Sequence, residues 1–530
     1  MLSNTLKHRL TQWPVNLVMG FLLIILLLPT LQLLSGWFDS DPQLWQHFAD
    51  TLLLDLISNT LLLLLGVTFG TLVLGVGLAW LVVMFEFPGR RWLSWLLLLP
   101  FAMPAYVLAF VFLGVFDYSG TVQNTLSQLG WTPIDIREGV WGPALVLSLV
   151  FYPYVYILSK TAFANQSITL IETAQSLGCG ANCIFWRVSL PLARPAIAAG
   201  LSLALMETLA DFGTVELFNY ATFTTAIYSA WEDFRSLAVA AQLSSLLLLF
   251  ALLLLGTERL TRGKRRYNQQ ARLSSPPFTL SRKAQWGMSL LLWGFLALTL
   301  GIPLLQLSLW AAQTLSQEWD ARYIDWFNST LILSVLAALI TVALALFMNA
   351  LQSQRHASRW LRFSIEVGKI GYALPGIVLA IGIMGLLATL NNWLNTQWFL
   401  GGLFALMLAY LVRFIAVAYG PVQSRFLSIK PNIIEAARNM GASKWRMAWQ
   451  IYLPLLKPGI LSALLLVFMD VSKELPATYL LRPFGWDTLA IRIFELSAEG
   501  LYERAAIPSL LLLLIGILGL WLMKRLGVIK

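Results

Sequence analysis

Long apolar stretches separated by short polar segments run along almost the whole chain. A helix needs about 20 mainly apolar residues to cross roughly 30 Å of hydrocarbon, and we identify twelve stretches of that kind. The pattern predicts an all-α polytopic membrane protein with about 12 transmembrane helices. The stretches lie near residues 15–37, 56–84, 92–116, 140–163, 193–215, 237–256, 286–311, 328–350, 366–390, 400–423, 457–480 and 505–524.

Composition points the same way. Of the 530 residues, 58% are hydrophobic and only 12% are charged, whereas about a quarter of the residues of a soluble protein are charged. Membrane lipid is therefore the expected surrounding of the chain, and an ordinary soluble domain is excluded.

Basic residues predict the orientation, because Lys and Arg concentrate in cytoplasmic loops. Most of the 36 Lys and Arg fall in alternate loops, which places both termini in the cytoplasm if the membrane is a bacterial inner (plasma) membrane. The net charge of +10 follows from this bias and gives no reason to expect nucleic-acid binding. Two basic residues, Arg413 and Lys473, fall within predicted spans and need acidic partners there.

Both cysteines, Cys179 and Cys183, fall on the predicted cytoplasmic side. Thiols stay reduced in that compartment. We therefore expect no structural disulfide.

The chain contains an internal duplication. A basic segment, 257–285, separates an N-terminal half, 1–256, from a C-terminal half, 286–530, and six predicted spans lie on each side of it. The sequence IETAQSLG at 171–178 aligns with IEAARNMG at 434–441 at an offset of 263 residues. Because each half has an even number of spans, the halves are predicted to be parallel repeats related by an axis along the membrane normal.

A spaced motif occurs once in each half, within the predicted cytoplasmic loops 164–191 and 424–454. It reads Glu-Ala-Ala, three residues, Gly, nine residues, Ile, one residue, Leu-Pro, and the first copy departs from it only at Thr173 and Val188. A short helix that ends at Gly, followed by a Pro that is tolerated in a first helical turn, accounts for the spacing. The motif residues are Glu172, Thr173, Ala174, Gly178, Leu190 and Pro191 in the first copy, and Glu435, Ala436, Ala437, Gly441, Leu453 and Pro454 in the second.

This motif resembles the hallmark of permeases of binding-protein-dependent ABC importers. The resemblance implies two fused copies of the type I (MetI-like) permease fold, in which each motif helix docks on one subunit of a homodimeric ABC ATPase. The alternative is that the two loop helices are alike only through duplication and have no partner.

The resemblance also implies that ATP and Mg are bound by the partner ATPase and that this chain needs no cofactor. In agreement, the sequence has no G-x-x-x-x-G-K-[ST] phosphate-binding loop. The chain is therefore expected to be a transport subunit and not an enzyme.

Two segments that follow the motifs, 206–231 and 469–510, resemble those of ferric iron permeases. They contain ADFGTV and KELPATYLLRPF. The resemblance implies a permease for ferric iron that is delivered by a periplasmic ferric-iron-binding protein. The alternatives are an ABC importer for thiamine, a polyamine or an aminoalkylphosphonate, and an ion-coupled secondary transporter.

Four acids in these segments are candidates for the translocation path: Glu207, Asp211, Asp470 and Glu474. Their i, i+4 spacing predicts that each pair shares one helix face, and intramembrane acids commonly face a wet cavity. The alternative is structural, because the acids could pair with Arg413 and Lys473 or cap helices broken nearby. No metal ligand set is identified from the sequence.

Acidic residues also concentrate in the predicted outer loops, for example Asp117, Asp135 and Glu138. The topology bias alone explains this distribution. The alternative is a docking surface for the periplasmic binding protein that the family resemblance implies.

Overall fold

The computed structural model describes residues 20–526, apart from 21–22, 39–40, 118–119, 131–134, 262–275, 319, 353–362, 364, 366–367, 369–370, 373 and 397–400. All regular elements in the described part are helices, and one isolated bridge joins Phe85 to Phe278. The all-α prediction is confirmed. Residues 262–275 of the predicted linker lie outside the described residues.

Ten described helices are long and apolar enough to cross a membrane, and two bent pairs raise the number to twelve. One bent pair falls in the predicted span 92–116: Arg90–Ala102 and Ala105–Val115 meet at 87°. The apolar pattern did not predict this bend, which arises because Pro104 has no N–H group and disfavours helical backbone at the residue before it.

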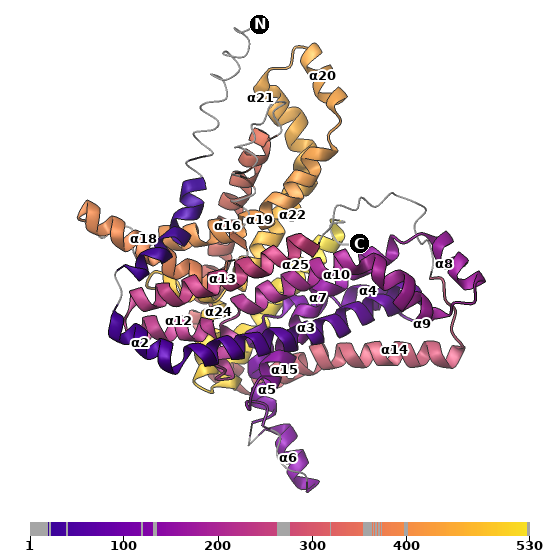
Figure 1. The fold of residues 1–530 in the computed structure, drawn as a ribbon, viewed down its shortest axis with the longest axis horizontal. Coiled ribbons are helices and arrows are strands. Elements are labelled where there is room, and N and C mark those ends of the chain that lie inside the picture. Colours follow the sequence, from indigo (N-terminus) through magenta and orange to yellow (C-terminus); the bar gives the residue numbers. More distant parts are fainter. Residues whose placement is uncertain are drawn as a thin grey trace.

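The N-terminal half contains spanning helices linked by shorter ones (Figure 1). Its elements are η1 (Leu33–Trp37), α2 (Pro42–Thr51), α3 (Leu53–Met84), α4 (Arg90–Leu96), η2 (Leu99–Ala102), α5 (Ala105–Val115), α6 (Thr121–Gln128), α7 (Trp141–Ala164), α8 (Ile168–Ser176), α9 (Ala181–Ile184), η3 (Phe185–Ser189), α10 (Leu190–Ala210), α11 (Gly213–Leu217), α12 (Phe223–Glu232) and α13 (Leu237–Thr261).

The C-terminal half repeats this order. Five of its elements begin 263 residues after their counterparts: α20, α21, η6, α22 and α23. Its elements are α14 (Arg282–Leu296), η4 (Ala297–Gly301), α15 (Ile302–Glu318), α16 (Ala321–Gln352), α18 (Gly376–Leu394), α19 (Leu403–Ser428), α20 (Pro431–Asn439), α21 (Lys444–Met447), η6 (Ala448–Tyr452), α22 (Leu453–Ser472), α23 (Pro476–Leu481), α24 (Leu489–Ala498) and α25 (Tyr502–Arg525).

Packing is equivalent within the two halves and also joins them. In the first half α3, α7 and α10 pack together, and in the second α16, α19 and α22 do so. The first span of each half crosses to the other half, since η1 contacts α18 and α15 contacts α5. Gly114 makes room for this crossing, because a Cβ atom there would lie 2.7 Å from the Trp310 ring.

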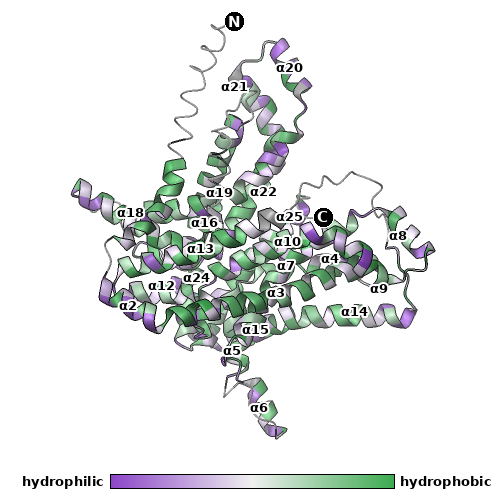
Figure 2. Cartoon of the chain, viewed as in Figure 1, coloured by the Kyte–Doolittle hydropathy of each residue, from purple (hydrophilic) through white to green (hydrophobic). Residues whose placement is uncertain are grey.

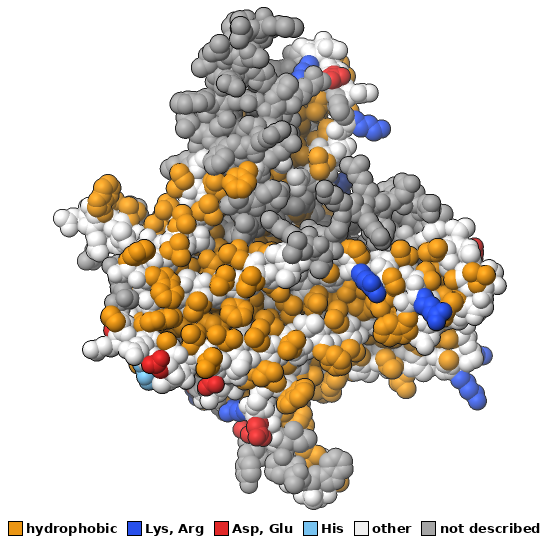
Figure 3. Space-filling model, in the orientation of Figure 1, with side chains coloured by type: hydrophobic (Ala, Val, Ile, Leu, Met, Phe, Trp, Pro, Cys, Tyr) orange, Lys and Arg blue, Asp and Glu red, His pale blue; other side chains and the backbone are white. Residues whose placement is uncertain are grey.

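The two halves form two divergent arms (Figure 1). The helices α3, α7 and α10 lead toward α8, whereas α16, α19 and α22 lead toward α20. Hydrophobic residues predominate along both arms, and hydrophilic residues gather at the tips (Figure 2). On the face shown in Figure 3, Lys and Arg lie mainly at the ends of the arms, and most acidic side chains lie along the lower edge, although some also lie at the ends of the arms.

Candidate transport site and coupling helices

The motif helices α8 and α20 end in the same way. Gly178 and Gly441 have φ of +82° and +76°, the left-handed backbone that glycine adopts without strain. Beyond each glycine, a backbone N–H reaches back to the motif alanine: Cys179 donates to the Ala174 carbonyl at 3.0 Å, and Ala442 donates to Ala437 at 3.1 Å. These bonds satisfy carbonyl groups at the helix end and explain why the motif needs Gly at this spacing.

The Leu-Pro pair of each motif lies further inside the span than the sequence predicts. The α-helical segments begin at Leu190 and Leu453, but a π-helical turn and a short helix precede each, so the spans run over Ala181–Ala210 and Trp445–Ser472. A π turn is a known way for a helix to absorb an irregularity. The proline directly after it therefore does not end the helix.

Exposed apolar side chains surround both motif helices at matching positions. Leu170 and Ile433 are 44% and 43% exposed, and Leu177 and Met440 are 81% and 79% exposed. Each pair is separated by the 263-residue offset. The sequence motif does not include these positions, although comparing the two repeats for apolar residues in polar loops would have found them.

The prediction that Cys179 and Cys183, in the turn after α8, form no disulfide is wrong. The structure joins Cys179 and Cys183 in a disulfide, with Cα atoms 5.4 Å apart. The chain reverses after Gly178 and so brings the two residues together. The predicted cytoplasmic location of the loop gives no information on this proximity.

The second acid of each pair lies at a break in its helix. The helix α10 ends at Ala210, and Asp211 has extended backbone; α22 ends at Ser472, two residues before Glu474. The prediction that each pair shares a continuous helix face is therefore wrong. The chain leaves the helix between the two acids of each pair and starts a new short helix, α11 or α23.

Asp211 and Glu474 cap these short helices. The Asp211 carboxylate accepts hydrogen bonds from the backbone N–H groups of Thr214 at 3.0 Å and Val215 at 3.3 Å. Glu474 accepts equivalent bonds from Ala477 at 3.0 Å and Thr478 at 2.9 Å. Carboxylates satisfy unpaired N–H groups at a helix start, so both acids hold the broken helices in shape.

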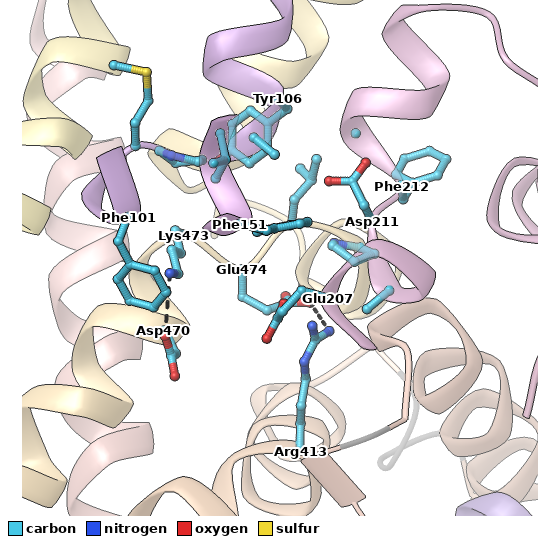
Figure 4. A pocket seen from close by; sticks show the side chains of 18 of the residues that line it. Phe101, Tyr106, Phe151, Glu207, Asp211, Phe212, Arg413, Asp470, Lys473 and Glu474 are labelled. Carbon is cyan, nitrogen blue, oxygen red and sulfur yellow. Dashed lines mark hydrogen bonds and ion pairs between the residues drawn. The ribbon is translucent and has the colours of Figure 1, made fainter. Parts of the chain in front are cut away.

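Glu474 also forms a buried ion pair with Arg413. The Arg413 Nη1 atom lies 3.1 Å from Glu474 Oε1, and both side chains are almost fully buried (Figure 4). The pair lies against the start of α18, where a Cβ atom on Gly376 would clash with both partners. Every oxygen of Glu474 thus has protein donors, because the Thr478 hydroxyl also bonds to Oε2.

Asp470 has a basic partner three residues further along the chain, just after the end of α22. Lys473 Nζ lies 3.5 Å from Asp470 Oδ1 and 4.2 Å from the centroid of the Phe101 ring. Figure 4 shows Lys473 between Phe101 and Asp470. The ammonium group therefore has an acidic partner and an aromatic one within the membrane.

Glu207 has phenolic partners and no basic one among the described residues. Its Oε1 atom accepts hydrogen bonds from the hydroxyls of Tyr372, at 2.8 Å, and Tyr154, at 3.3 Å. Tyr154 comes from α7 and Tyr372 from just before α18, in the other half. Sequence analysis missed both tyrosines, because neither belongs to a motif.

Tyr154 and the charged groups line a cavity of about 90 Å³ between the halves, and Tyr372 lies behind Glu207, outside the lining. Six charged residues line the cavity, four acids (Glu207, Asp211, Asp470 and Glu474) and two bases (Arg413 and Lys473). The structure therefore brings all four predicted acids together. Both bases belong to the C-terminal half; at the 263-residue offset the N-terminal half has Val150 and Ala210, which also line the cavity.

The cavity is thus electrostatically asymmetric. The acids of the C-terminal half lie beside basic partners, while Glu207 and Asp211 of the N-terminal half have only hydrogen-bond donors among the described residues. Among the residues that the structure describes, no group of three or more His, Cys, Asp or Glu side chains has metal-binding geometry. Any metal ligand set here would have to include other oxygen donors.

Comparison with known proteins places these features in a family. The model of the binding-protein-dependent transport system inner membrane component matches residues 71–266 and 341–527. A Fe(3+)-transport system permease protein of Haemophilus influenzae is 27% identical over 481 residues, 89% of this chain and 90% of the relative.

Two further relatives show the range of the similarity. A probable sulfate transport system permease protein of Chlorokybus atmophyticus is 31% identical, over 40% of this chain and 74% of the relative. A probable ABC transporter permease protein of Sinorhizobium fredii is 23% identical, over 86% of this chain and 84% of the relative. The family model matches both halves, and the chain therefore belongs to the family of binding-protein-dependent transport system inner membrane components, as a multi-pass inner-membrane transport subunit with two permease domains.

Proposed function

We propose that this chain is the complete membrane pathway of an ATP-driven importer for ferric iron. Both halves of the pathway belong to one polypeptide, and the cavity between them receives the ion from a periplasmic binding protein. The observation that carries the proposal is this cavity, which lies where the fifth span of each half breaks and which four acids and two bases line.

The net negative charge of the cavity favours a cation as cargo. A desolvated anion would meet four carboxylates and only two basic groups, and unpaired charge in a low-dielectric site is costly. This argues against sulfate, although a sulfate permease is among the relatives. The similarity to a ferric iron permease extends over 89% of this chain, and carboxylates suit hard cations.

The ATPase partner is inferred from the repeated coupling surface. Large exposed apolar side chains at a cytoplasmic loop mark an interaction site, and both halves present them at the same positions around α8 and α20. Two equal surfaces in one chain fit two equal subunits, which is what a homodimeric ATPase offers. ATP and Mg would bind to that partner, and α8 and α20 would transmit its closure.

This orientation places α8, α20 and both termini in the cytoplasm. It is supported by Lys and Arg at the ends of the arms and by acidic side chains at the opposite edge on the face that Figure 3 shows. The binding protein would then dock on the acidic outer side.

Reconstitution tests the proposal. The full chain, its ATPase and a ferric-loaded binding protein are placed in proteoliposomes, and uptake of labelled ferric iron is measured with ATP and without a proton gradient. ATP-dependent uptake is expected. Uptake that follows the proton gradient and ignores ATP would instead establish an ion-coupled secondary transporter.

The coupling helices provide the control. The double variant Glu172→Arg with Glu435→Arg is expected to insert normally and to lose both uptake and substrate-stimulated ATP hydrolysis. Normal substrate-stimulated hydrolysis in this variant would show that α8 and α20 do not couple the two proteins.

A further inference from the structure

We infer that Glu207, Tyr154 and Tyr372 form a seat for a trivalent hard cation at the edge of the cavity, which Glu207 and Tyr154 line. The inference rests on the proposed iron transport and deepens it, since it assigns the ligands. The three side chains already converge on one point, because both tyrosine hydroxyls donate to the same oxygen, Glu207 Oε1.

The seat spans the two halves of the molecule. Glu207 and Tyr154 belong to the N-terminal half, on α10 and α7, whereas Tyr372 precedes α18 in the C-terminal half. A movement of one half against the other separates Tyr372 from the other two ligands. The affinity of the seat therefore depends on the conformation, as transport by alternating access requires.

Charge favours a trivalent ion over a divalent one. When the ion binds, each phenol releases its proton to water and coordinates through the phenolate oxygen, while Glu207 coordinates through its carboxylate. One carboxylate and two phenolates then neutralise three positive charges. Neutral assemblies cost the least to bury, and tyrosine oxygen is an established ligand of ferric iron in proteins.

The corresponding position in the C-terminal half cannot form the same seat. Asp470 is the repeat counterpart of Glu207, and Phe101 is the counterpart of Tyr372 at the 271-residue offset of that segment. Lys473 lies 3.5 Å from Asp470 and over the Phe101 ring. A built-in ammonium group thus occupies the place of a cation there, so one ion rather than two is expected.

A further oxygen of the cavity has no hydrogen-bond partner. Tyr106 lines the cavity and is 4% exposed, and its hydroxyl finds no partner among the described residues. Among the described residues, no donor forms a hydrogen bond with the other carboxylate oxygen of Glu207, Oε2. An unsatisfied buried oxygen such as the Tyr106 hydroxyl is uncommon in proteins, and this one belongs to a residue that lines the cavity.

Spectroscopy of the purified full-length chain tests the seat directly. Ferric nitrilotriacetate is titrated into the wild type, and the visible band that phenolate-to-iron charge transfer produces is recorded against a chelate blank. The wild type is expected to give this band. The double variant Tyr154→Phe with Tyr372→Phe is expected to lose it, and Glu207→Gln to weaken it.

The matched control is Tyr156→Phe, which removes a hydroxyl two residues away on the same helix. That hydroxyl donates to the Ser94 carbonyl at 3.0 Å, away from Glu207. The band is expected to persist in this variant. In the variant, an excess of trivalent gallium should abolish the band, because gallium competes for the same ligands. The same excess of divalent magnesium should leave the band unchanged. Size-exclusion profiles and circular dichroism confirm that all variants are folded.

The proposal is overturned if the wild type gives no band, or if the tyrosine double variant keeps the wild-type band. These results separate the seat from the proposed function. Iron uptake in proteoliposomes without a band refutes the ligand set and leaves iron transport standing. A tyrosine-dependent band without iron uptake supports the seat and refutes the transport function.

Discussion

Acids at equivalent positions of the two halves have different surroundings. Glu207 and Asp470 correspond in the repeat, yet the first has tyrosine donors and the second a lysine. Asp211 and Glu474 both cap short helices, but only Glu474 also has an arginine. The two halves thus share the acids and differ in what surrounds them, because Arg413 and Lys473 correspond to Val150 and Ala210.

The sequence was sufficient to find these acids but not to assign their contacts. Their repeated spacing within apolar spans identified them, because buried acids are rare in membranes. The sequence also allowed the alternative that the acids cap broken helices, and the structure confirms it at Asp211 and Glu474. The approach of Tyr372 to Glu207 was inaccessible, because it depends on packing between residues 165 positions apart.

The buried pair of Glu474 and Arg413 provides a stability prediction. Removing one partner leaves a buried charge, so Glu474→Gln is expected to lower the free energy of unfolding by about 3–5 kcal/mol. Chemical denaturation in detergent measures the loss. The control is Glu86→Gln, which breaks an exposed Arg90 pair of the same 3.1 Å separation and should cost less than about 1 kcal/mol. Equal losses in the two variants would contradict the account.

At the level of elements, the motif helices α8 and α20 were the most predictable part of the molecule. Motif spacing alone located α8 and α20, since a helix end with left-handed glycine has a recognisable sequence. The irregular spans were less predictable. The bend between η2 and α5, the π turns before α10 and α22, and the short helices α11 and α23 interrupt stretches that are uniformly apolar.

The apolar side chains around α8 and α20 give a prediction for assembly. Replacing Leu177 and Met440 by Asp together is expected to abolish co-purification of the ATPase, because both side chains would be buried in the interface. Each single variant should retain part of the binding through the intact copy. Pull-down and ATPase stimulation measure the effect.

Leu129→Asp is the control for this experiment. Leu129 is 64% exposed and follows α6, on the side predicted to face outward. Loss of ATPase binding in this variant, or its retention in the double variant, would argue against a docking surface formed by α8 and α20.

At the scale of the whole molecule, the fold consists of two parallel repeats whose arms diverge toward α8 and α20 (Figure 1). The duplication predicted the parallel arrangement, because even numbers of spans keep both copies in one orientation. It did not predict the crossing of the first spans onto the other half, which arises from contacts such as Trp310 against Gly114.

The divergence of the arms predicts a movement. Spin labels at Ser176 and Asn439, at the ends of α8 and α20, are placed in a chain whose native cysteines are replaced by serine. Distances are measured by double electron–electron resonance with the ATPase bound. Adding a non-hydrolysable ATP analogue is expected to shorten the distance between the labels, because closure of the ATPase dimer draws its two docking sites together. An unchanged or longer distance would contradict this coupling.

Uptake of labelled ferric iron by proteoliposomes tests most directly whether the ion passes Glu207. The proteoliposomes contain wild-type chain or Glu207→Gln, with Asp55→Asn on the exposed side of α3 as control. We expect ATP-dependent accumulation by the wild type and the control, and a rate reduced by about tenfold or more in Glu207→Gln, since a charged partner is worth about 1.5–3 kcal/mol. Accumulation at the wild-type rate in Glu207→Gln, or no accumulation of ferric iron by the wild type, would contradict this expectation.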